Sequence, residues 1–175
     1  MSSKGNADDP GPTAGYLVWR LSTKVRVAVD RAMAPLGLTH AKYALAASLY
    51  GLHRGGTRPS QRQLADHTGL EALYVSKLAR ALEADGLLER TRDPDDPRAV
   101  RLALTERGRE TTRQAIEVVQ RLMAVWLAPL GGPDSARTRE FTATLATLLD
   151  TPLGLPAEPS ENAGPSEPHA TEEQS

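Results

Sequence analysis

Apolar residues recur at helical spacing in the first third of the chain and predict two helices. The first helix is expected over residues 14–34. Its apolar stripe consists of Leu17, Leu21, Val25, Ala28 and Ala32 and is widened by Val18 and Val29. Pro35 and Gly37 end this helix, because proline lacks a backbone N–H and glycine favours turns. The second begins at Thr39 as N-cap and extends to about residue 53, with Ala44, Leu45, Ser48, Leu49 and Leu52 directed inward.

Residues 60–86 contain two shorter helical patterns joined by a tight turn. Ser60 and Gln63 have the spacing of a capping box, so a helix begins at Ser60 and ends at Gly69. The next helix extends from about Glu71 to Gly86, and its apolar face is formed by Val75, Leu78, Ala79 and Leu82. This pattern alone fits an ordinary helical hairpin as well as a helix-turn-helix whose second helix enters a major groove.

The alternating segment that follows predicts a β-hairpin. Val100, Leu102 and Leu104 alternate with Arg101 and Ala103, as in a half-buried strand, and prolines and aspartates crowd the turn before it. The hairpin carries Arg90, Arg92, Arg98 and Arg101. We therefore expect a mainly α fold with a small β-hairpin, a winged helix-turn-helix. The aspartates could instead pair with these arginines on a solvated loop, and both interpretations hold if only some arginines are paired.

Two long amphipathic helices complete the pattern. Thr105 caps a helix over residues 105–128, in which Ile116, Val119, Leu122, Met123 and Trp126 recur at helical spacing. A break at residues 129–133 precedes a final helix over residues 134–150, capped by Asp134 and bearing Phe141, Leu145, Leu148 and Leu149. The terminal helices hold more apolar residues than the small winged unit can cover. We expect a two-fold dimer through them; a three-helix bundle within one chain is the alternative.

Charge is distributed unevenly along the 175 residues, whose formal net charge is −1. Residues 151–175 contain five of the 22 acidic residues and none of the 21 basic ones, so residues 1–150 hold 21 basic and 17 acidic residues, a net charge of +4. The tail is rich in Pro, Glu, Ser and Ala and lacks periodicity, which predicts disorder, as we also expect for residues 1–13.

Several classes of chemistry find no support in the sequence. Cysteine is absent, which excludes disulfides, thiolate metal sites and a cysteine redox switch. We see no bilayer-spanning apolar run and no signal-peptide core, and expect a cytoplasmic protein. The histidines (His40, His53, His67 and His169) lack metal-site spacing, and no phosphate loop or nucleophile motif occurs. We expect no enzyme activity, no cofactor and no metal.

The central motifs resemble those of the MarR family of bacterial transcriptional regulators. The resemblance spans about residues 14–150 and is strongest over residues 82–90, ending in DGLLER, and 93–108, an Asp-Pro hairpin leading into LTERG. It implies a homodimer in which helices 14–34, 105–128 and 134–150 dimerise and residues 39–104 bind a palindromic operator, usually as a ligand-released repressor. By matched position, residues 71–85 form the recognition helix, with residues 72–77 as its groove-facing start, and Asp96 with Arg98 stabilise the wing. Tyr74 departs from the small hydroxyl residue common in the family.

The candidate DNA-binding residues divide by chemistry. Ser76, Lys77 and Arg80 can donate hydrogen bonds to bases or phosphates, Ala72 and Leu73 suit a thymine methyl, and Tyr74 can do either. Ser60, Gln61 and Gln63 lie at a helix start, which suits a phosphate. Arg58, Arg92, Arg98 and Arg101 would add salt-dependent affinity. Alternatively, Leu73 or Tyr74 belongs to the core and any one of these arginines is solvated.

A small-molecule effector is also implied by the resemblance, often an aromatic or phenolic acid bound between the dimerisation helices and the winged unit. Residues of the first two helices that combine aromatic faces with donors are Tyr16, Trp19, Arg20, His40 and Tyr43. Alternatively, the aromatic residues belong to the dimer core and Arg20 is exposed.

The sequence as a whole thus predicts a homodimeric, sequence-specific DNA-binding regulator, a ligand-responsive repressor on a pseudo-palindromic operator whose half-sites lie roughly 10 bp apart. Its alternatives are a winged-helix protein–protein interaction module and a low-specificity architectural DNA binder.

Overall fold

Threonine side chains start the first two helices of the computed structural model, which describes residues 11–93, 96, 99–152 and 154. Helix α1 (Ala14–Met33) begins after Thr13, whose side chain accepts a hydrogen bond from the backbone N–H of Tyr16. Helix α2 (His40–Arg54) begins in the same way after Thr39, as predicted. A 3₁₀ turn, η1 (Ala34–Leu36), and Gly37 at a φ of 70° connect them.

The helix-turn-helix consists of α3 (Gln61–Thr68) and α4 (Ala72–Ala84). Both hydrogen bonds of the capping box are present: Gln63 N donates to Ser60 Oγ at 3.2 Å, and Ser60 N donates to Gln63 Oε1 at 2.8 Å. Gly69 ends α3 at a φ of 68°, a conformation that only glycine adopts without strain. The predicted caps at both ends of α3 are therefore confirmed.

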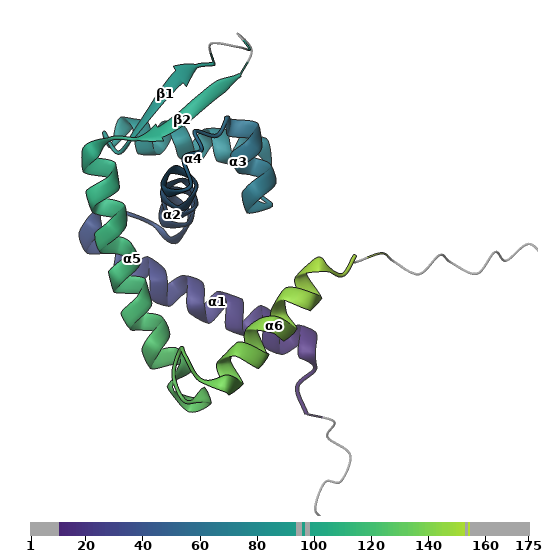
Figure 1. Cartoon of the computed structure of the whole chain (residues 1–175). Coiled ribbons are helices and arrows are strands. Elements are labelled where there is room, and N and C mark those ends of the chain that lie inside the picture. The colour runs from purple at the N-terminus through teal and green to yellow at the C-terminus, as the bar shows by residue number, and fades with distance from the viewer. Residues whose placement is uncertain (1–10, 94–95, 97–98, 153, 155–175) are drawn as a thin grey trace, which may run out of the picture.

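The wing is an antiparallel pair of strands, β1 (Leu88–Arg92) and β2 (Val100–Leu104). The register pairs Leu88 with Leu104 and Arg92 with Val100. Leu102 and Leu104 are buried, as the alternating pattern predicts, and Leu102 N donates to Pro59 O at 3.0 Å. The wing is therefore joined to the start of α3, and the mainly helical winged fold is confirmed (Figure 1).

Helix α5 (Glu106–Leu127) leads through the 3₁₀ turn η2 (Ala128–Leu130) to α6 (Ala136–Asp150). Thr105 caps α5 as predicted, but the prediction that Asp134 caps the last helix was wrong. Ser135 is the N-cap, and its hydroxyl accepts from Thr138 N at 3.1 Å and donates to Leu130 O at 2.7 Å. Two glycines with positive φ, Gly131 and Gly132, turn the chain so that the serine hydroxyl reaches both groups.

The hydrophobic core surrounds α2, which packs against α1, α4, α5 and β2. Its largest fully buried side chains are Met33, Leu45, Leu49, Leu64, Leu82, Leu88, Leu102 and Leu104. Only the C-terminal half of α1 contributes, through Val29 and Met33, while Leu17 at the other end is 51% exposed. The predicted stripe from Leu17 to Ala32 is therefore not one buried face, because α2 and α5 cover only half of the helix.

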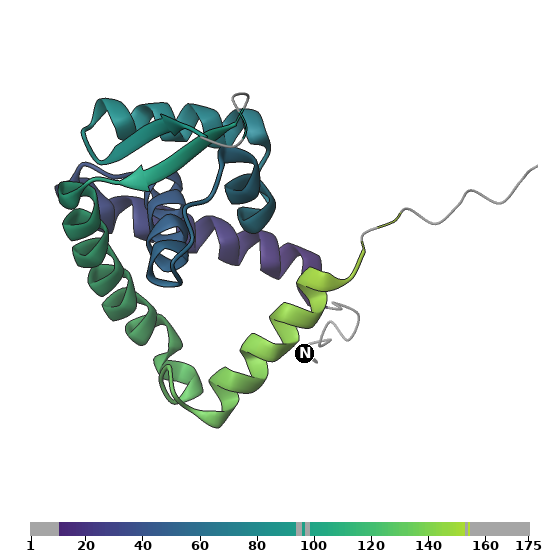
Figure 2. The ribbon, with the colours of Figure 1, turned by 45° about the horizontal axis from the view of Figure 1, so that its top comes forward.

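Helices α5 and α6 diverge from η2 as the two arms of a V (Figure 2). Trp126 and Phe141 pack edge to face near the junction, with ring centroids 6.3 Å apart. Beyond it, α6 does not pack extensively on α1 or on the winged unit, so the described residues do not form the three-helix bundle that was the alternative to a dimer. None of the helices in the described ranges is long and apolar enough to cross a membrane. The predicted disordered ends, residues 1–13 and 151–175, lie largely outside the described residues.

Candidate nucleic-acid interface

One exposed stripe runs along the outward side of α4. Leu73, Lys77 and Arg80, at positions i, i+4 and i+7, are exposed, and we call them the α4 outward stripe. The opposite side of the helix is the buried face Val75, Leu78, Ala79 and Leu82, as predicted. Leu73 is 84% exposed, so it does not belong to the core of the described chain. The stripe therefore presents one apolar and two cationic side chains to any ligand that approaches α4.

The other predicted α4 residues lie on its flanks. Ala72 lines a hollow beside the wing, and Ser76 is half-buried. Tyr74 is 42% exposed but lines a different pocket on the opposite flank, together with Asp30 and His40. Within residues 72–77, the structure thus places Leu73 and Lys77 on the outward side and turns Ala72 and Tyr74 away from it.

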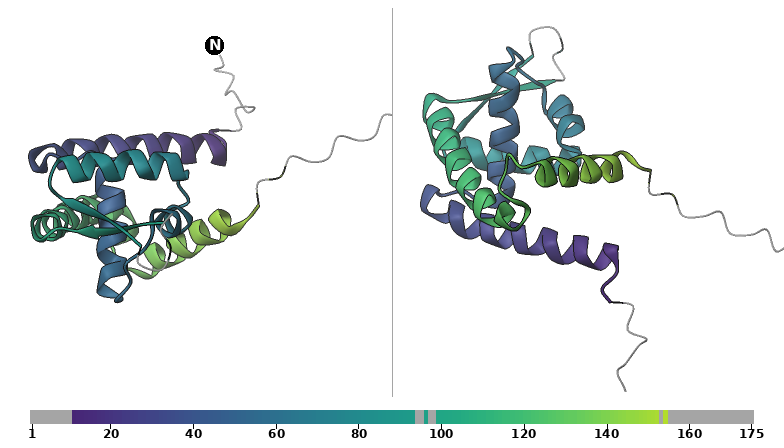
Figure 3. Two further views of the ribbon diagram at one scale, coloured as in Figure 1. Left: turned by 90° about the horizontal axis from the view of Figure 1, so that it is seen from above. Right: turned by 60° about the horizontal axis from the view of Figure 1, so that its bottom comes forward.

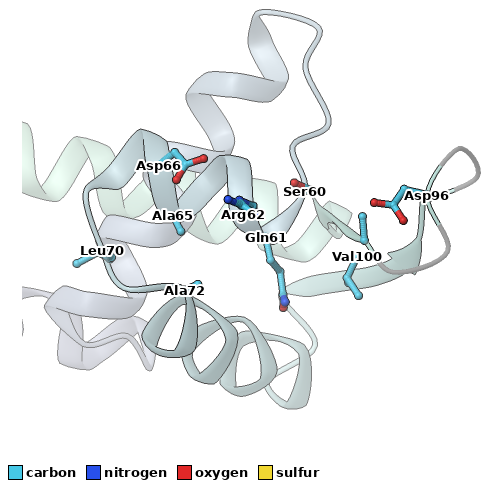
Figure 4. A pocket seen from close by; sticks show the side chains of 10 residues that line it. Ser60, Gln61, Arg62, Ala65, Asp66, Leu70, Ala72, Asp96 and Val100 are labelled. Atoms are coloured by element: carbon cyan, nitrogen blue, oxygen red, sulfur yellow. The ribbon is translucent and has the colours of Figure 1, made fainter.

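The hollow beside the wing has a volume of about 750 Å³ and is bounded by the start of α3, the start of α4 and the wing (Figure 4). It is lined by Ser60, Gln61, Arg62, Ala65, Asp66, Leu70, Ala72, Asp96, Ala99 and Val100. Side chains from α3 face Asp96 and Val100 of the wing across it. The helix start that was predicted to contact a phosphate therefore opens onto a shared concave surface.

The first turn of α3 is capped and also paired with the wing. Ser60 and Gln63 satisfy each other's backbone N–H groups, and Ser60 forms an isolated antiparallel β-bridge with Arg101. Arg62 is exposed and lines the hollow, and the sequence analysis missed it. The signal was available, because residue 62 lies between two predicted contact residues. The Arg62 side chain and the positive end of the α3 dipole give the α3 start a positive character suited to a phosphate.

The wing arginines have different environments. Arg92 is exposed at the end of β1, whereas Arg98 lies outside the described residues. Arg101 does not project freely: its Nε lies 2.8 Å from Asp93 Oδ2, and its Nη1 donates to Arg58 O at 3.0 Å. The Arg101 guanidinium therefore joins the wing to the loop before α3, which fits the alternative that some wing arginines are paired, and its contact with a phosphate stays a prediction.

Asp93 is the wing residue that the sequence analysis missed. The predicted stabilising pair was Asp96 with Arg98; Asp96 is exposed and lines the hollow, and Arg98 is not described. Asp93 is 9% exposed and pairs with Arg101, and its N–H donates to Ala99 O at 3.0 Å. The strand register shows why these two residues meet: it places Asp93 opposite Ala99, diagonally across from Arg101 on the same face of the hairpin.

The five residues predicted to bind an effector are not brought together. Tyr16, Trp19 and Arg20 form an exposed cluster at the start of α1, where Arg20 Nη1 donates to Tyr16 Oη at 3.0 Å. Tyr43 packs against the core, and burial raises the pKa of its hydroxyl. Within one chain the five residues do not share a crevice, because the exposed cluster lies on the half of α1 that α2 does not cover, and the effector site stays a prediction.

His40 lines a separate pocket of about 410 Å³ between α1, α2 and the start of α4. The lining residues are Arg26, Asp30, Thr39, His40, Ala41, Ala44, Leu70 and Tyr74. The backbone N–H of His40 donates to Asp30 Oδ1 at 2.6 Å, which fixes α2 against α1. This pocket therefore lies between α1 and α4, the helix that carries the outward stripe.

His53 belongs to the packing of the wing. Its Nε2 lies 3.2 Å from Leu102 O and acts as donor, since a carbonyl can only accept. Burial lowers the pKa of the imidazole, the charges of Arg58 and Arg109 lower it further, and the hydrogen bond to Leu102 opposes them. In the described ranges, no three His, Asp or Glu side chains are grouped closely enough to hold a metal ion.

Comparison with known proteins gives concordant similarities. A model described as "MarR family" matches residues 36–99. The uncharacterised HTH-type transcriptional regulator YdcH of Bacillus subtilis is 31% identical over 140 residues, 80% of this chain and 92% of that protein. The HTH-type transcriptional repressor Rv2887 of Mycobacterium tuberculosis is 32% identical over 147 residues, 82% and 97% of the two chains. The crystal structure of the M. tuberculosis transcriptional regulator MosR in complex with DNA has 26% identity and a TM-score of 0.62, covering 79% and 96% of the two chains.

Proposed function

The chain belongs to the MarR family, and from this premise we propose that it is a cytoplasmic transcriptional repressor that binds a pseudo-palindromic operator as a homodimer. The observation that carries the proposal is the α4 outward stripe, in which Lys77 and Arg80 are exposed beside an arginine-bearing wing. An α-helix fits the major groove of B-DNA, where the edges of the four base pairs can be distinguished. The similarity to Rv2887, a repressor, and to MosR, crystallised with DNA, supports this proposal.

Base and phosphate contacts are divided between elements in this proposal. Lys77 and Arg80 donate to base edges or adjacent phosphates, and Ser76 contacts the groove from the flank of α4. The phosphate backbone lies along the α3 start, near Arg58 and Arg62, and reaches the wing at Arg92 and Arg98. Gln61 and Gln63 remain proposed phosphate contacts because they belong to that first turn.

The dimer surface proposed here is formed by α1 and α6. Large apolar side chains are exposed on both: Tyr16, Leu17, Val18 and Trp19 on α1, and Leu145, Leu148 and Leu149 on α6. The start of α1 and the end of α6 lie on the same side of the molecule in both views of Figure 3. A second copy that covers these faces would remove them from water, which is the main driving force of such an association.

The test is selection of bound duplexes from a random-sequence library, followed by a salt titration of the selected duplex. We expect an enriched inverted repeat and a steep loss of affinity with salt. Lys77→Ala and Arg80→Ala should weaken binding to that repeat while the dimer persists in sedimentation analysis, and Lys24→Ala, exposed on α1, is the matched control. Arg98→Ala should reduce affinity for all duplexes alike; a changed base preference at one position would contradict the phosphate assignment.

Two other outcomes identify the alternatives. Steep salt dependence without an enriched sequence indicates an architectural binder. Weak binding to every duplex, with no dependence on salt, indicates a protein–protein interaction module that retains only the fold.

Release from DNA by a small aromatic acid is the finer part of the proposal. The pocket lined by Arg26, His40 and Tyr74 supports it, since it combines cationic and aromatic groups and adjoins α4. A ligand that binds more tightly to the form unable to bind DNA shifts the population toward that form. We expect 4-hydroxybenzoate to displace the operator from the wild type and to lose this effect with Arg26→Ala. Equal displacement from both proteins would rule out this pocket.

A further inference from the structure

We infer that Leu73 contacts the C5-methyl group of a thymine in each operator half-site, so that this methyl group is required for full affinity. The inference deepens the proposed function and rests on it. It assigns a base preference to one side chain, which neither the family membership nor the similar proteins provide.

The position of Leu73 carries the inference. Its side chain is 84% exposed and lies on the same side of α4 as Lys77 and Arg80, one and two turns further along the helix. Ala72 faces the hollow beside the wing, and Tyr74 faces the pocket that contains His40. Among the first three residues of α4, Leu73 is therefore the one that projects outward between those two flanks.

The chemistry of leucine selects the group that it contacts. Leucine has no hydrogen-bond donor or acceptor, so it cannot recognise the polar edges of guanine, adenine or cytosine. The thymine methyl is the apolar group that the major groove offers, and contact with Leu73 would remove both surfaces from water. Lys77 and Arg80 on the same stripe attract the phosphate backbone and would bring α4 close enough for this contact.

The charges on the stripe distinguish Leu73 from the exposed apolar residues elsewhere. Leu148 and Leu149 on α6, and Leu17 and Val18 on α1, lie beside other apolar side chains, as in a surface that associates with protein. Leu73 is instead followed on its stripe by two cations. A polyanionic partner fits this combination better than a second protein surface does.

The experiment uses the full-length protein and the operator selected from the library. Each thymine is replaced in turn by deoxyuridine, which lacks only the methyl group, symmetrically in both half-sites. We expect one position at which affinity falls roughly four-fold per half-site, the value for burial of one methyl-sized group. Leu73→Ala should bind the thymine operator more weakly and be insensitive to deoxyuridine at that position, which is the coupling that a double-mutant cycle measures.

Two control variants separate this contact from general weakening. Leu73→Met keeps a flexible apolar side chain and should keep the sensitivity to deoxyuridine. Lys77→Ala should lose affinity for both operators by the same factor. Circular dichroism should show Leu73→Ala folded like the wild type, because the replaced side chain is exposed.

The failures are distinguishable. If the wild type binds all deoxyuridine operators as tightly as the thymine operator, or if Leu73→Ala keeps the sensitivity, the methyl contact is wrong while DNA binding stands. If the wild type binds no duplex with sequence preference, the proposed function fails, and this inference fails with it.

Discussion

Lys42 Nζ donates to Asp85 Oδ2 at 2.6 Å, which joins the first turn of α2 to the residue that caps the C-terminus of α4. The side chains are 22% and 39% exposed, so water screens the pair only in part. The lysine also places a positive charge near the negative end of the α4 dipole. Since α2 is the centre of the core, this contact helps to fix the helix that carries the outward stripe.

Lys42→Met should therefore lower the free energy of unfolding by about 1 kcal/mol, because it removes the charge but keeps an unbranched side chain. Urea denaturation measures the change. Arg26→Met is the control: it breaks the more exposed Arg26–Asp30 pair, with atoms 3.6 Å apart, and should have little effect. If the effects of Lys42→Met and Asp85→Asn add fully in the double variant, the two residues do not interact and the prediction fails.

Gly108→Ala should destabilise the protein by about 3 kcal/mol, the upper part of the range for overpacking. A Cβ atom at this position would lie 1.9 Å from the backbone oxygen of Leu87, so the start of α5 or the start of the wing would have to move. This contact explains the glycine of the LTERG motif. Thermal and urea denaturation measure the loss.

Gly51→Ala is the matched control for Gly108→Ala. Gly51 lies in α2, and a Cβ atom added there would meet no atom within 4 Å beyond its own helix backbone. Alanine there should leave stability unchanged or raise it by about 0.5–1 kcal/mol, because alanine is the better helix former. A mild effect of Gly108→Ala, comparable with that of Gly51→Ala, would show that α5 can move away from the wing.

Arg101→Lys should weaken DNA binding without changing base preference. Lysine keeps the charge but cannot contact both Asp93 and the carbonyl of Arg58 in the planar arrangement of a guanidinium. The wing would keep the backbone hydrogen bond from Leu102 to Pro59 but lose this side-chain connection to the loop before α3, so affinity should fall for every duplex by a similar factor. Fluorescence anisotropy with the selected operator and a scrambled duplex measures this. An unchanged affinity for both would show that the wing is held in place without Arg101.

The stability of the protein should fall with acidification because of His53. Burial lowers the pKa of its imidazole below the ordinary value of 6.5, so in acid the unfolded chain binds a proton that the folded chain does not. At pH values above 6.5, His53 does not make the stability depend on pH. The stability is lost as the pH falls from that value toward the lower pKa of the imidazole in the folded state. Melting temperatures between pH 7.5 and pH 5.5 measure the loss.

His53→Gln removes the titrating group and keeps an amide donor for Leu102 O. We expect its melting temperature to fall less than that of the wild type over the same range. Parallel curves for the two proteins would show that the imidazole is not the group responsible.

Local sequence signals determined most of the secondary structure. The capping box of Ser60 and Gln63, the threonine caps and Gly69 act within one helical turn, so their effect does not depend on the rest of the fold. The alternation of Val100, Leu102 and Leu104 determined which side of β2 is buried for the same reason. The one wrong cap, Asp134 in place of Ser135, follows two glycines whose conformation depends on the turn around them.

The residues that α4 exposes could be predicted from the sequence, whereas the contacts of the wing arginines could not. The helical periodicity of the sequence alone separated Leu73, Lys77 and Arg80 from the buried face of α4, because the 3.6-residue repeat fixes which residues of a helix lie on the same side. It could not show that Arg101 is occupied by Asp93 and Arg58 O, since that arrangement joins residues from both strands and a loop.

The sequence by itself determined the elements, most of their caps and the buried sides of α4 and β2, because these depend on interactions over a few residues and on the preference of apolar groups to leave water. The tertiary structure alone decided which half of α1 is covered, why residue 108 is glycine, and that the five predicted effector residues do not share a pocket. Those features depend on distances between segments far apart in the chain, and only the packing of whole elements fixes such distances.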